Sequence, residues 1–282
     1  MAAVPVAAGT DLMGGRVFYK MTGSGNDFVV FDGRDAPASA WTSEYVAELC
    51  DRRRGIGADG LVVLTPDGAS RVRMDYWNCD GSRADMCGNA ALCSTNLSAL
   101  LEMAPLEGME LVTRAGSFRS RCRADDRARL DLPDVDLPKP VTGLVPEPGE
   151  APAMLTAVGV PHLVLEVQDL ERPDLMSRGR ELRWHPALAP SGANVNFLAP
   201  ARKGSGWYMR TYERGVEGET LACGTGAVAA AITLGHAGKA TFPVEIVTRS
   251  GLPLRIAASL GPGYAREVSL EGEGRLVYRG VV

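Results

Sequence analysis

The chain has 282 residues, 45 % of them hydrophobic and 23 % charged, as in a globular protein of one large or two medium domains. Its formal net charge of −4 excludes the strongly basic surface of a nucleic-acid-binding protein. No apolar run is long enough to span a membrane. Residues 1–15 lack the basic start of a secretory signal, so we expect a flexible extension there and a cytoplasmic protein.

The first half of the chain predicts strands arranged around one helix. Hydrophobic periodicity indicates strands near residues 16–21, 28–31, 61–64, 71–77, 110–113, 117–123 and 128–132. A short amphipathic helix is predicted over Ser43–Cys50, with Ser43 as its N-terminal cap. A second helix runs from Cys87 to about Leu101, and its small side chains would let strands pack closely around it.

Six prolines within residues 133–152 mark the clearest boundary in the chain. Beyond them the order of elements broadly repeats. Strands are predicted near residues 153–158, 162–167, 194–199 and 206–213, followed by a helix from about Cys223 to His236 and four further strands. Strands of antiparallel type around one helix favour an α+β fold over a doubly wound sheet.

We therefore expect two pseudo-symmetric domains, each a mostly antiparallel sheet or barrel wrapped around a central helix. The predicted N-terminal domain covers residues 16–132, the Pro-rich linker residues 133–149 and the C-terminal domain residues 150–267. The last strand, about residues 268–282, is expected to pack back on the first domain.

Both predicted central helices begin with the same dipeptide, Cys87-Gly88 in one and Cys223-Gly224 in the other. Unpaired N–H groups give a helix start a partial positive charge, which stabilises a thiolate and binds an anion. Glycine after the cysteine leaves room for a ligand carboxylate. The remaining thiols lack this context, and we expect them to be buried structural residues: Cys50, Cys79, Cys93 and Cys122.

Two matched thiols suit the inversion of a carbon centre, because one group must remove a proton from one face while the other delivers a proton to the opposite face. The α-proton of an amino acid is far less acidic than a thiol, so the barrier must fall by about 8–20 kcal/mol. No Cys-x-x-Cys pair occurs and the three histidines are scattered, so we expect no metal. No lysine lies in a recognisable pyridoxal-phosphate context.

A series of motifs extends this reading over most of residues 16–238. They are Lys20–Phe28, Cys50–Arg52, Gly55–Gly60, Asn78–Ser82, Met86–Asn89, Gly159–His162, Ala193–Val195, Tyr212–Gly215 and Glu219–Gly226. Together they resemble the motifs of the diaminopimelate epimerase family. The resemblance implies pyridoxal-phosphate-independent epimerisation of LL-2,6-diaminopimelate to the meso form by two thiols, in lysine and peptidoglycan precursor biosynthesis. It also implies no cofactor, a homodimer, and an active site in the cleft between the two domains.

The resemblance also assigns individual residues. Catalytic positions of the family correspond to Cys87, Cys223, His162 and Glu213, and substrate-binding positions to Asn26, Asn78, Gly88, Asn89, Asn194, Glu213, Arg214, Gly224 and Thr225. Cys87 and Cys223 would be the acid/base pair. His162 and Glu213 would position substrate and tune the thiols, and Arg214 would bind the distal carboxylate. The chain departs from the family at Val160, where many members have Asn, and at Gly60, where some have an amide.

Three alternatives stay open at this point. A cofactor-independent racemase of the proline type would use the same pair of cysteines, but would not need Glu213-Arg214 for a second amino acid centre. A redox protein would cycle Cys87 and Cys223 between dithiol and disulfide. A binding module without catalysis is the third alternative, which the loss of a substrate contact at Val160 keeps open.

Overall fold

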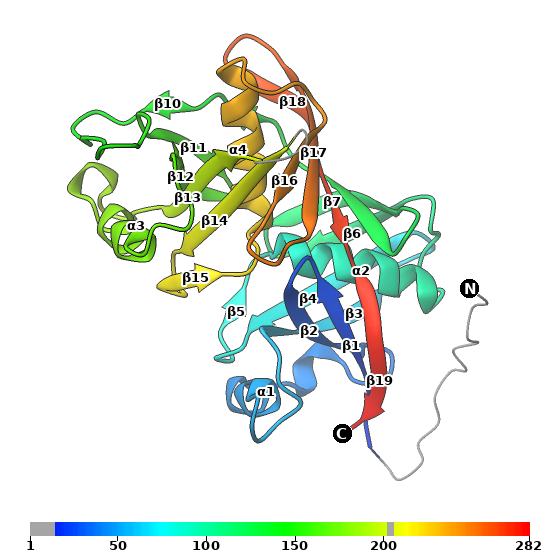
Figure 1. Cartoon of the computed structure of the whole chain (residues 1–282). Coiled ribbons are helices and arrows are strands. Elements are labelled where there is room, and N and C mark those ends of the chain that lie inside the picture. The colour runs from blue at the N-terminus through cyan, green and yellow to red at the C-terminus, as the bar shows by residue number, and fades with distance from the viewer. Residues whose placement is uncertain (1–14, 202–205) are drawn as a thin grey trace. The chain divides into compact units, whose positions relative to one another are not determined.

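The computed structural model describes residues 15–201 and 206–282. The chain divides into two compact units (Figure 1). Of the described residues, unit 1 contains those up to Leu130 together with Gly272–Val282, and unit 2 contains those within Asp131–Glu271. Apart from Gly15, the extension predicted for residues 1–15 lies outside the described residues.

The described residues of unit 1 form strands, two α-helices and one 3-10 turn (Ala38–Ala40). In chain order its elements are β1 (Val17–Gly23), β2 (Asn26–Asp32), α1 (Ser43–Cys50), β3 (Gly60–Pro66), β4 (Arg71–Asn78), β5 (Arg83–Ala84), α2 (Gly88–Leu100), β6 (Met109–Thr113), β7 (Gly116–Cys122) and β8 (Arg127–Asp131). The final strand, β19 (Arg275–Val281), pairs antiparallel with β1.

Unit 2 begins with two very short strands and ends on the long strand that leads back to unit 1. Its elements are β9 (Val135–Asp136), β10 (Lys139–Pro140), β11 (Met154–Val158), β12 (Val160–Glu166), α3 (Leu175–Arg183), a 3-10 turn (Pro186–Leu188), β13 (Asn194–Pro200), β14 (Trp207–Glu213), β15 (Gly218–Thr220), α4 (Gly224–His236), β16 (Val244–Val247), β17 (Pro253–Leu260) and β18 (Tyr264–Glu273).

The two units share one topology. In unit 1, β1–β2 is antiparallel, β2–β3 parallel, β3–β4 antiparallel, β4–β6 parallel and β6–β7 antiparallel. In unit 2, β11–β12, β12–β13, β13–β14, β14–β16 and β16–β17 repeat that alternation in the same order. The helices α1 and α3 occupy matching places in chain order, as do α2 and α4. The predicted α+β fold is therefore confirmed, with a mixed sheet in each unit.

In each unit the central helix is surrounded by strands of its own unit (Figure 1). Helix α2 contacts β1, β2, β3, β4, β6, β7 and β19, and helix α4 contacts β11, β12, β13, β16 and β17. Short side chains allow this close approach. The fully buried alanines of the two helices are Ala90, Ala91, Ala227, Ala229, Ala230 and Ala231.

The outer face of each sheet is covered by the other helix of its unit. In unit 2, Val195 and Phe197 of β13 and Tyr212 of β14 share a buried apolar cluster with Leu175 and Leu182 of α3. Successive strand residues point to opposite faces. The polar residues between these apolar ones therefore face α4, and this alternation supplies the polar side chains of the candidate site.

Two details of the helices differ from the sequence-based expectation. The cap of α1 is Thr42, whose hydroxyl accepts a hydrogen bond from the backbone N–H of Tyr45 at 3.3 Å, and Ser43 is the first helical residue. Helix α3 was not predicted. Its buried face includes Arg178, whose guanidinium pairs with the fully buried carboxylate of Glu150 at 3.0 Å. Because an ion pair occupies part of the buried face, the sequence lacks the regular apolar periodicity from which a helix is predicted.

We predict that Gly274→Ala destabilises unit 1. A Cβ at Gly274 would lie 2.5 Å from the carbonyl oxygen of Leu92 in α2, and helix backbone cannot move aside as a flexible side chain would. The expected loss in free energy of unfolding is about 1–3 kcal/mol, measured by urea titration. The control is Gly108→Ala, whose Cβ meets no atom within 4 Å. Equal stability of the two variants would contradict this account of the packing.

Candidate active site

Cys87 lies at the start of α2, where its backbone is still extended (φ −134°, ψ 124°) and its carbonyl oxygen accepts the first helical hydrogen bond, from Ala91 N–H at 2.9 Å. Gly88 and Asn89, the first two helical residues, are buried and neither is charged. The N–H groups of this first turn have no partner within the helix. Cys87 therefore lies beside a partial positive charge.

Cys223 has the same position relative to α4. Its backbone is extended (φ −128°, ψ 106°), and its carbonyl oxygen accepts from Ala227 N–H at 2.9 Å. The side chain is buried, and its sulfur lies 3.7 Å from the hydroxyl of Thr225. Each unit thus contributes one thiol at the N-terminus of a buried helix, as the matched dipeptides predict.

In unit 1 two of the predicted asparagines form a chain of hydrogen bonds. The amide nitrogen of Asn26 donates to a carboxylate oxygen of Asp59 at 2.9 Å, and the amide nitrogen of Asn89 donates to the amide oxygen of Asn26 at 2.7 Å. An ionised carboxylate only accepts, so Asp59 fixes the orientation of both amides. The amide oxygen of Asn89 is left buried without a hydrogen-bond partner among the described residues.

Ion pairs connect Asp59, at the end of this chain of hydrogen bonds, to further charged residues of unit 1. Arg52 bonds to Asp59 at 2.7 Å and to Asp27 at 2.6 Å, and Lys20 pairs with Asp27 at 2.6 Å. Burial acts to raise the pKa of the Asp27 carboxyl, but the hydrogen bonds from Arg52 and Lys20 outweigh it and hold that pKa below its usual range. Asp27 is therefore ionised at neutral pH.

Asn78 lies apart from this chain, at the end of β4, and its amide nitrogen donates to the hydroxyl of Ser82 at 3.0 Å. It pairs with Gly60 across the β3–β4 ladder. A Cβ at Gly60 would lie 2.6 Å from both the backbone carbonyl oxygen of Trp77 and the ring of Tyr76, so a larger side chain would have to displace backbone as well as that ring. The departure at Gly60 thus has a packing cause.

In unit 2 three adjacent strands bring the predicted polar residues together. His162 on β12 lies directly opposite Asn194 on β13 in a parallel pair. The side-chain oxygen of Asn194 accepts a hydrogen bond from the backbone N–H of Arg214 at 2.8 Å. Glu213, at the end of β14, accepts from the hydroxyl of Thr220 at 2.7 Å. These bonds fix the strand ends from which Glu213 and Arg214 project.

His162 is fully buried. Burial, and secondarily the charge of Arg214, lower the pKa of its imidazole to about 3, so the ring is neutral at physiological pH. One ring nitrogen, Nδ1, lies 3.3 Å from the amide nitrogen of Asn196. The other, Nε2, is buried and has no hydrogen-bond partner among the described residues.

The remaining four cysteines are also free thiols. Burial raises the pKa of Cys50 to about 12, and that of the fully buried Cys93 well above its ordinary value. Burial also raises the pKa of Cys79 and Cys122. A thiol with a raised pKa is a weak nucleophile at neutral pH. Cys50 and Cys93 are buried as expected, whereas Cys122 is half-buried and Cys79 is exposed, so the expected burial is wrong for Cys79.

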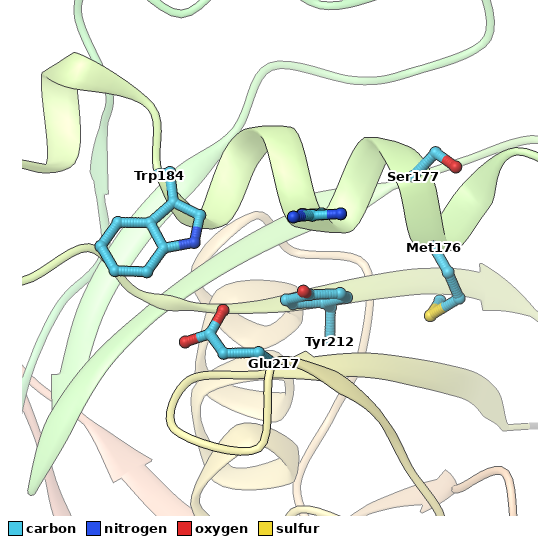
Figure 2. Close-up of a pocket in the computed structure, with 6 residues that line it drawn as sticks. Met176, Ser177, Trp184, Tyr212 and Glu217 are labelled. Carbon is cyan, nitrogen blue, oxygen red and sulfur yellow. The ribbon is translucent and has the colours of Figure 1, made fainter.

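Unit 2 also has a surface pocket that contains none of the predicted site residues. Figure 2 shows it beside α3, with the indole of Trp184 and the carboxylate of Glu217 at one end and Met176 at the other. Tyr212, which packs against Gly179 of α3, lines its floor. Tyr212 and Glu213 point to opposite faces of β14. This pocket and the polar cluster formed by His162, Asn194 and Glu213 therefore lie on opposite sides of that strand.

Sequence reasoning did not single out Asp59 or Asn196, the two residues that orient predicted site residues. Asp59 lies within the motif Gly55–Gly60, and Asn196 follows Asn194 by two positions. The period of a strand puts Asn194 and Asn196 on one face, which is the signal that could have identified the second.

Within residues 15–201 and 206–282, no three His, Cys, Asp or Glu side chains converge as a metal site requires. No helix in the same described ranges is long and apolar enough to cross a membrane.

Comparison with known proteins identifies the family. The model of the family described as diaminopimelate epimerase matches residues 18–136 and 154–259. A curated diaminopimelate epimerase of Gemmatimonas aurantiaca is 44 % identical over 281 residues, covering 94 % of this chain and 98 % of that protein. The chain belongs to the diaminopimelate epimerase family.

Solved structures with much lower sequence identity share the fold of this diaminopimelate epimerase family member. A phenazine biosynthesis protein of the PhzF family from Bacillus anthracis is 11 % identical, with a TM-score of 0.73 over 96 % of this chain and 99 % of that one. A probable proline racemase from Agrobacterium radiobacter is 19 % identical, with a TM-score of 0.67 over 95 % and 92 %. At such identities the likeness extends to the fold alone.

We predict that His162 makes stability depend on pH. Its pKa is about 3 in the fold and about 6.5 when unfolded, so between these values the unfolded chain binds the extra proton. The free energy of unfolding should fall as pH drops from 6.5 toward 3, by up to about 1.4 kcal/mol per unit from this group. Urea titrations of wild type and His162→Gln at pH 7, 6 and 5 test this. Parallel curves for the two proteins would contradict it.

Proposed function

We propose that this chain catalyses the pyridoxal-phosphate-independent epimerisation of LL-2,6-diaminopimelate to meso-2,6-diaminopimelate, a step of lysine and peptidoglycan precursor biosynthesis. The observation that carries the proposal is the pair of thiols, Cys87 and Cys223, each at the start of a buried helix in a member of this family. The reaction needs two groups of the same kind, because its reverse exchanges their roles.

The proposed mechanism moves one proton at each thiol. The thiolate of one cysteine takes the α-proton and becomes a thiol, while the thiol of the other delivers its proton to the opposite face and becomes a thiolate. One negative charge is therefore present on the pair before and after. Which cysteine acts first depends on the configuration of the substrate.

Backbone N–H groups are the proposed binding site for the reacting carboxylate. Gly88 and Asn89 would contribute from α2, and Gly224 and Thr225 from α4. Negative charge spreads onto that carboxylate as the α-proton leaves, so fixed N–H dipoles stabilise the transition state more than the ground state. Such electrostatic stabilisation is the largest contribution available toward the barrier reduction of about 8–20 kcal/mol.

The substrate's second amino acid centre explains the remaining polar residues in this proposal. A planar guanidinium binds a carboxylate with two parallel hydrogen bonds, and Arg214 is proposed to hold the distal carboxylate in this way. Glu213 would accept from an ammonium group and, with His162, adjust the environment of the thiols. Asn26, Asn78 and Asn194 are proposed as neutral contacts to the zwitterion. Val160 provides no hydrogen bond from its side chain.

Two further parts of the proposal concern assembly and location. We propose that the two thiols face one substrate across a cleft between the domains, and that the enzyme is a homodimer, with a mass in solution of about twice 29.9 kDa by sedimentation. A monomer in that measurement would contradict the dimer. We also propose a cytoplasmic location, where reducing conditions keep both thiols available.

The test of the activity is solvent deuterium incorporation. The enzyme is incubated with LL-diaminopimelate in heavy water with a reductant and no added cofactor. Because a solvent-exchanged thiol delivers the new proton, the meso product should carry deuterium at the inverted α-carbon. Absence of exchange would overturn the epimerase proposal. Exchange with proline but not with diaminopimelate would point to the racemase instead.

We predict that Cys87→Ala and Cys223→Ala each abolish epimerisation, to less than about one-thousandth of wild type, because proton transfer on one face is then lost. Far-ultraviolet circular dichroism should show that both variants remain folded. The matched control is Cys122→Ala, which removes a half-buried thiol of raised pKa and should keep activity. Full activity in either of the first two variants would refute the two-base mechanism.

A further inference from the structure

Asn196 lies behind His162, on the face of the sheet that α4 covers. Both residues are fully buried. The amide nitrogen of Asn196 donates to the backbone carbonyl oxygen of Leu163 at 3.1 Å and lies 3.3 Å from Nδ1 of His162. Its amide oxygen accepts from the hydroxyl of Thr211 at 3.0 Å. Three of the four hydrogen-bonding positions of the Asn196 amide are thus occupied by buried groups.

The orientation of the Asn196 amide is determined by its partners. A backbone carbonyl oxygen only accepts hydrogen bonds, so the side of the amide that faces Leu163 must be the NH₂ group. The second hydrogen of that NH₂ group is then directed at Nδ1 of His162. An amide flipped by 180° would set its oxygen against the Leu163 carbonyl and leave two buried acceptors facing each other.

This orientation determines the tautomer of the histidine. A neutral imidazole has one N–H and one lone pair, and the nitrogen that accepts a hydrogen bond is the one without the proton. Since Nδ1 of His162 accepts from Asn196, the proton is on Nε2. Nε2 is also the atom left buried without a partner among the described residues.

We propose that Asn196 is a positioning residue that holds His162 as the Nε2–H tautomer, so that the histidine offers a hydrogen-bond donor to the candidate site and does not act as a base. The proposal rests on the function proposed above for the part that concerns catalysis. An N–H donor stabilises an anion, such as the substrate carboxylate or a thiolate, whereas a lone pair would repel it.

The same asparagine is in close contact with the catalytic helix. A Cβ at Gly226, in the first turn of α4, would lie 2.4 Å from the amide oxygen of Asn196 and 3.2 Å from the sulfur of Cys223. The absence of a side chain at Gly226 lets Asn196 approach the turn that starts at Cys223. Asn196 therefore touches the elements that carry two of the proposed catalytic groups, His162 and Cys223.

The direct test is the tautomer of His162 in the substrate-free enzyme. The chain has only three histidines, so long-range ¹H–¹⁵N spectra of ¹⁵N-labelled protein resolve each ring, and His162→Gln assigns the signals. We expect the nitrogen pattern of a neutral Nε2–H ring at pH 7. A Nδ1–H ring, an imidazolium or an even mixture of tautomers would overturn the proposal, whether or not any variant folds.

Substitutions then identify the cause. Asn196→Asp places an acceptor against Nδ1, so His162 should change to the Nδ1–H form or to the imidazolium. The matched control is Thr211→Val, which removes the hydroxyl on the oxygen side of the amide and should leave the Nε2–H form in place. An unchanged tautomer in folded Asn196→Asp would show that Asn196 does not set it.

Kinetics separate a positioning role from a packing role. Where Asn196→Asp converts His162 to the Nδ1–H form, we expect kcat to fall roughly 10–100-fold, because the donor at Nε2 that would stabilise the developing negative charge is lost. A rise in KM with unchanged kcat would contradict the proposal. If the wild-type tautomer is as expected but no epimerisation occurs, the proposed function fails while the assignment of Asn196 and His162 stands.

Discussion

The close packing of strands around two alanine-rich helices is the constraint on which the rest of the structure depends. Short side chains allow many strands to contact one helix. At the start of such a buried helix, the first backbone N–H groups have no hydrogen-bond partner within the helix. The sequence therefore puts Cys87 and Cys223 at the helix starts and methyl groups along the helix bodies. In each helix the buried alanines pack against strands, and the cysteine lies at the first turn.

Hydrogen-bond direction is controlled by groups that can only accept. In unit 1 the carboxylate of Asp59 orients Asn26 and, through it, Asn89. In unit 2 the carbonyl of Leu163 orients Asn196, which in turn meets His162. Amides and imidazoles are ambiguous by themselves, and one fixed acceptor removes the ambiguity from a whole chain of them.

The sequence predicts much of this fold because the pattern of apolar residues is regular where the core is apolar. The central helices, their cysteines and most longer strands follow from periodicity and from two matched dipeptides. Prediction fails where burial is polar. Helix α3 buries Arg178 in an ion pair with Glu150, which an apolar pattern does not indicate. Nothing in the sequence distinguishes Asn196 from other strand residues until the pairing of β12 with β13 is known. The polar residues that face α4 come together through pairing of strands β12, β13 and β14. Hydrophobic periodicity predicts individual strands but does not predict which strands pair.

The repeated topology means that one structural plan is used twice within a single chain, yet the two units differ in their polar side chains. One carries linked asparagines and a charged network, the other a neutral histidine with a glutamate and an arginine. A thiol at the start of the central helix is thus common to both units, whereas the polar side chains are not.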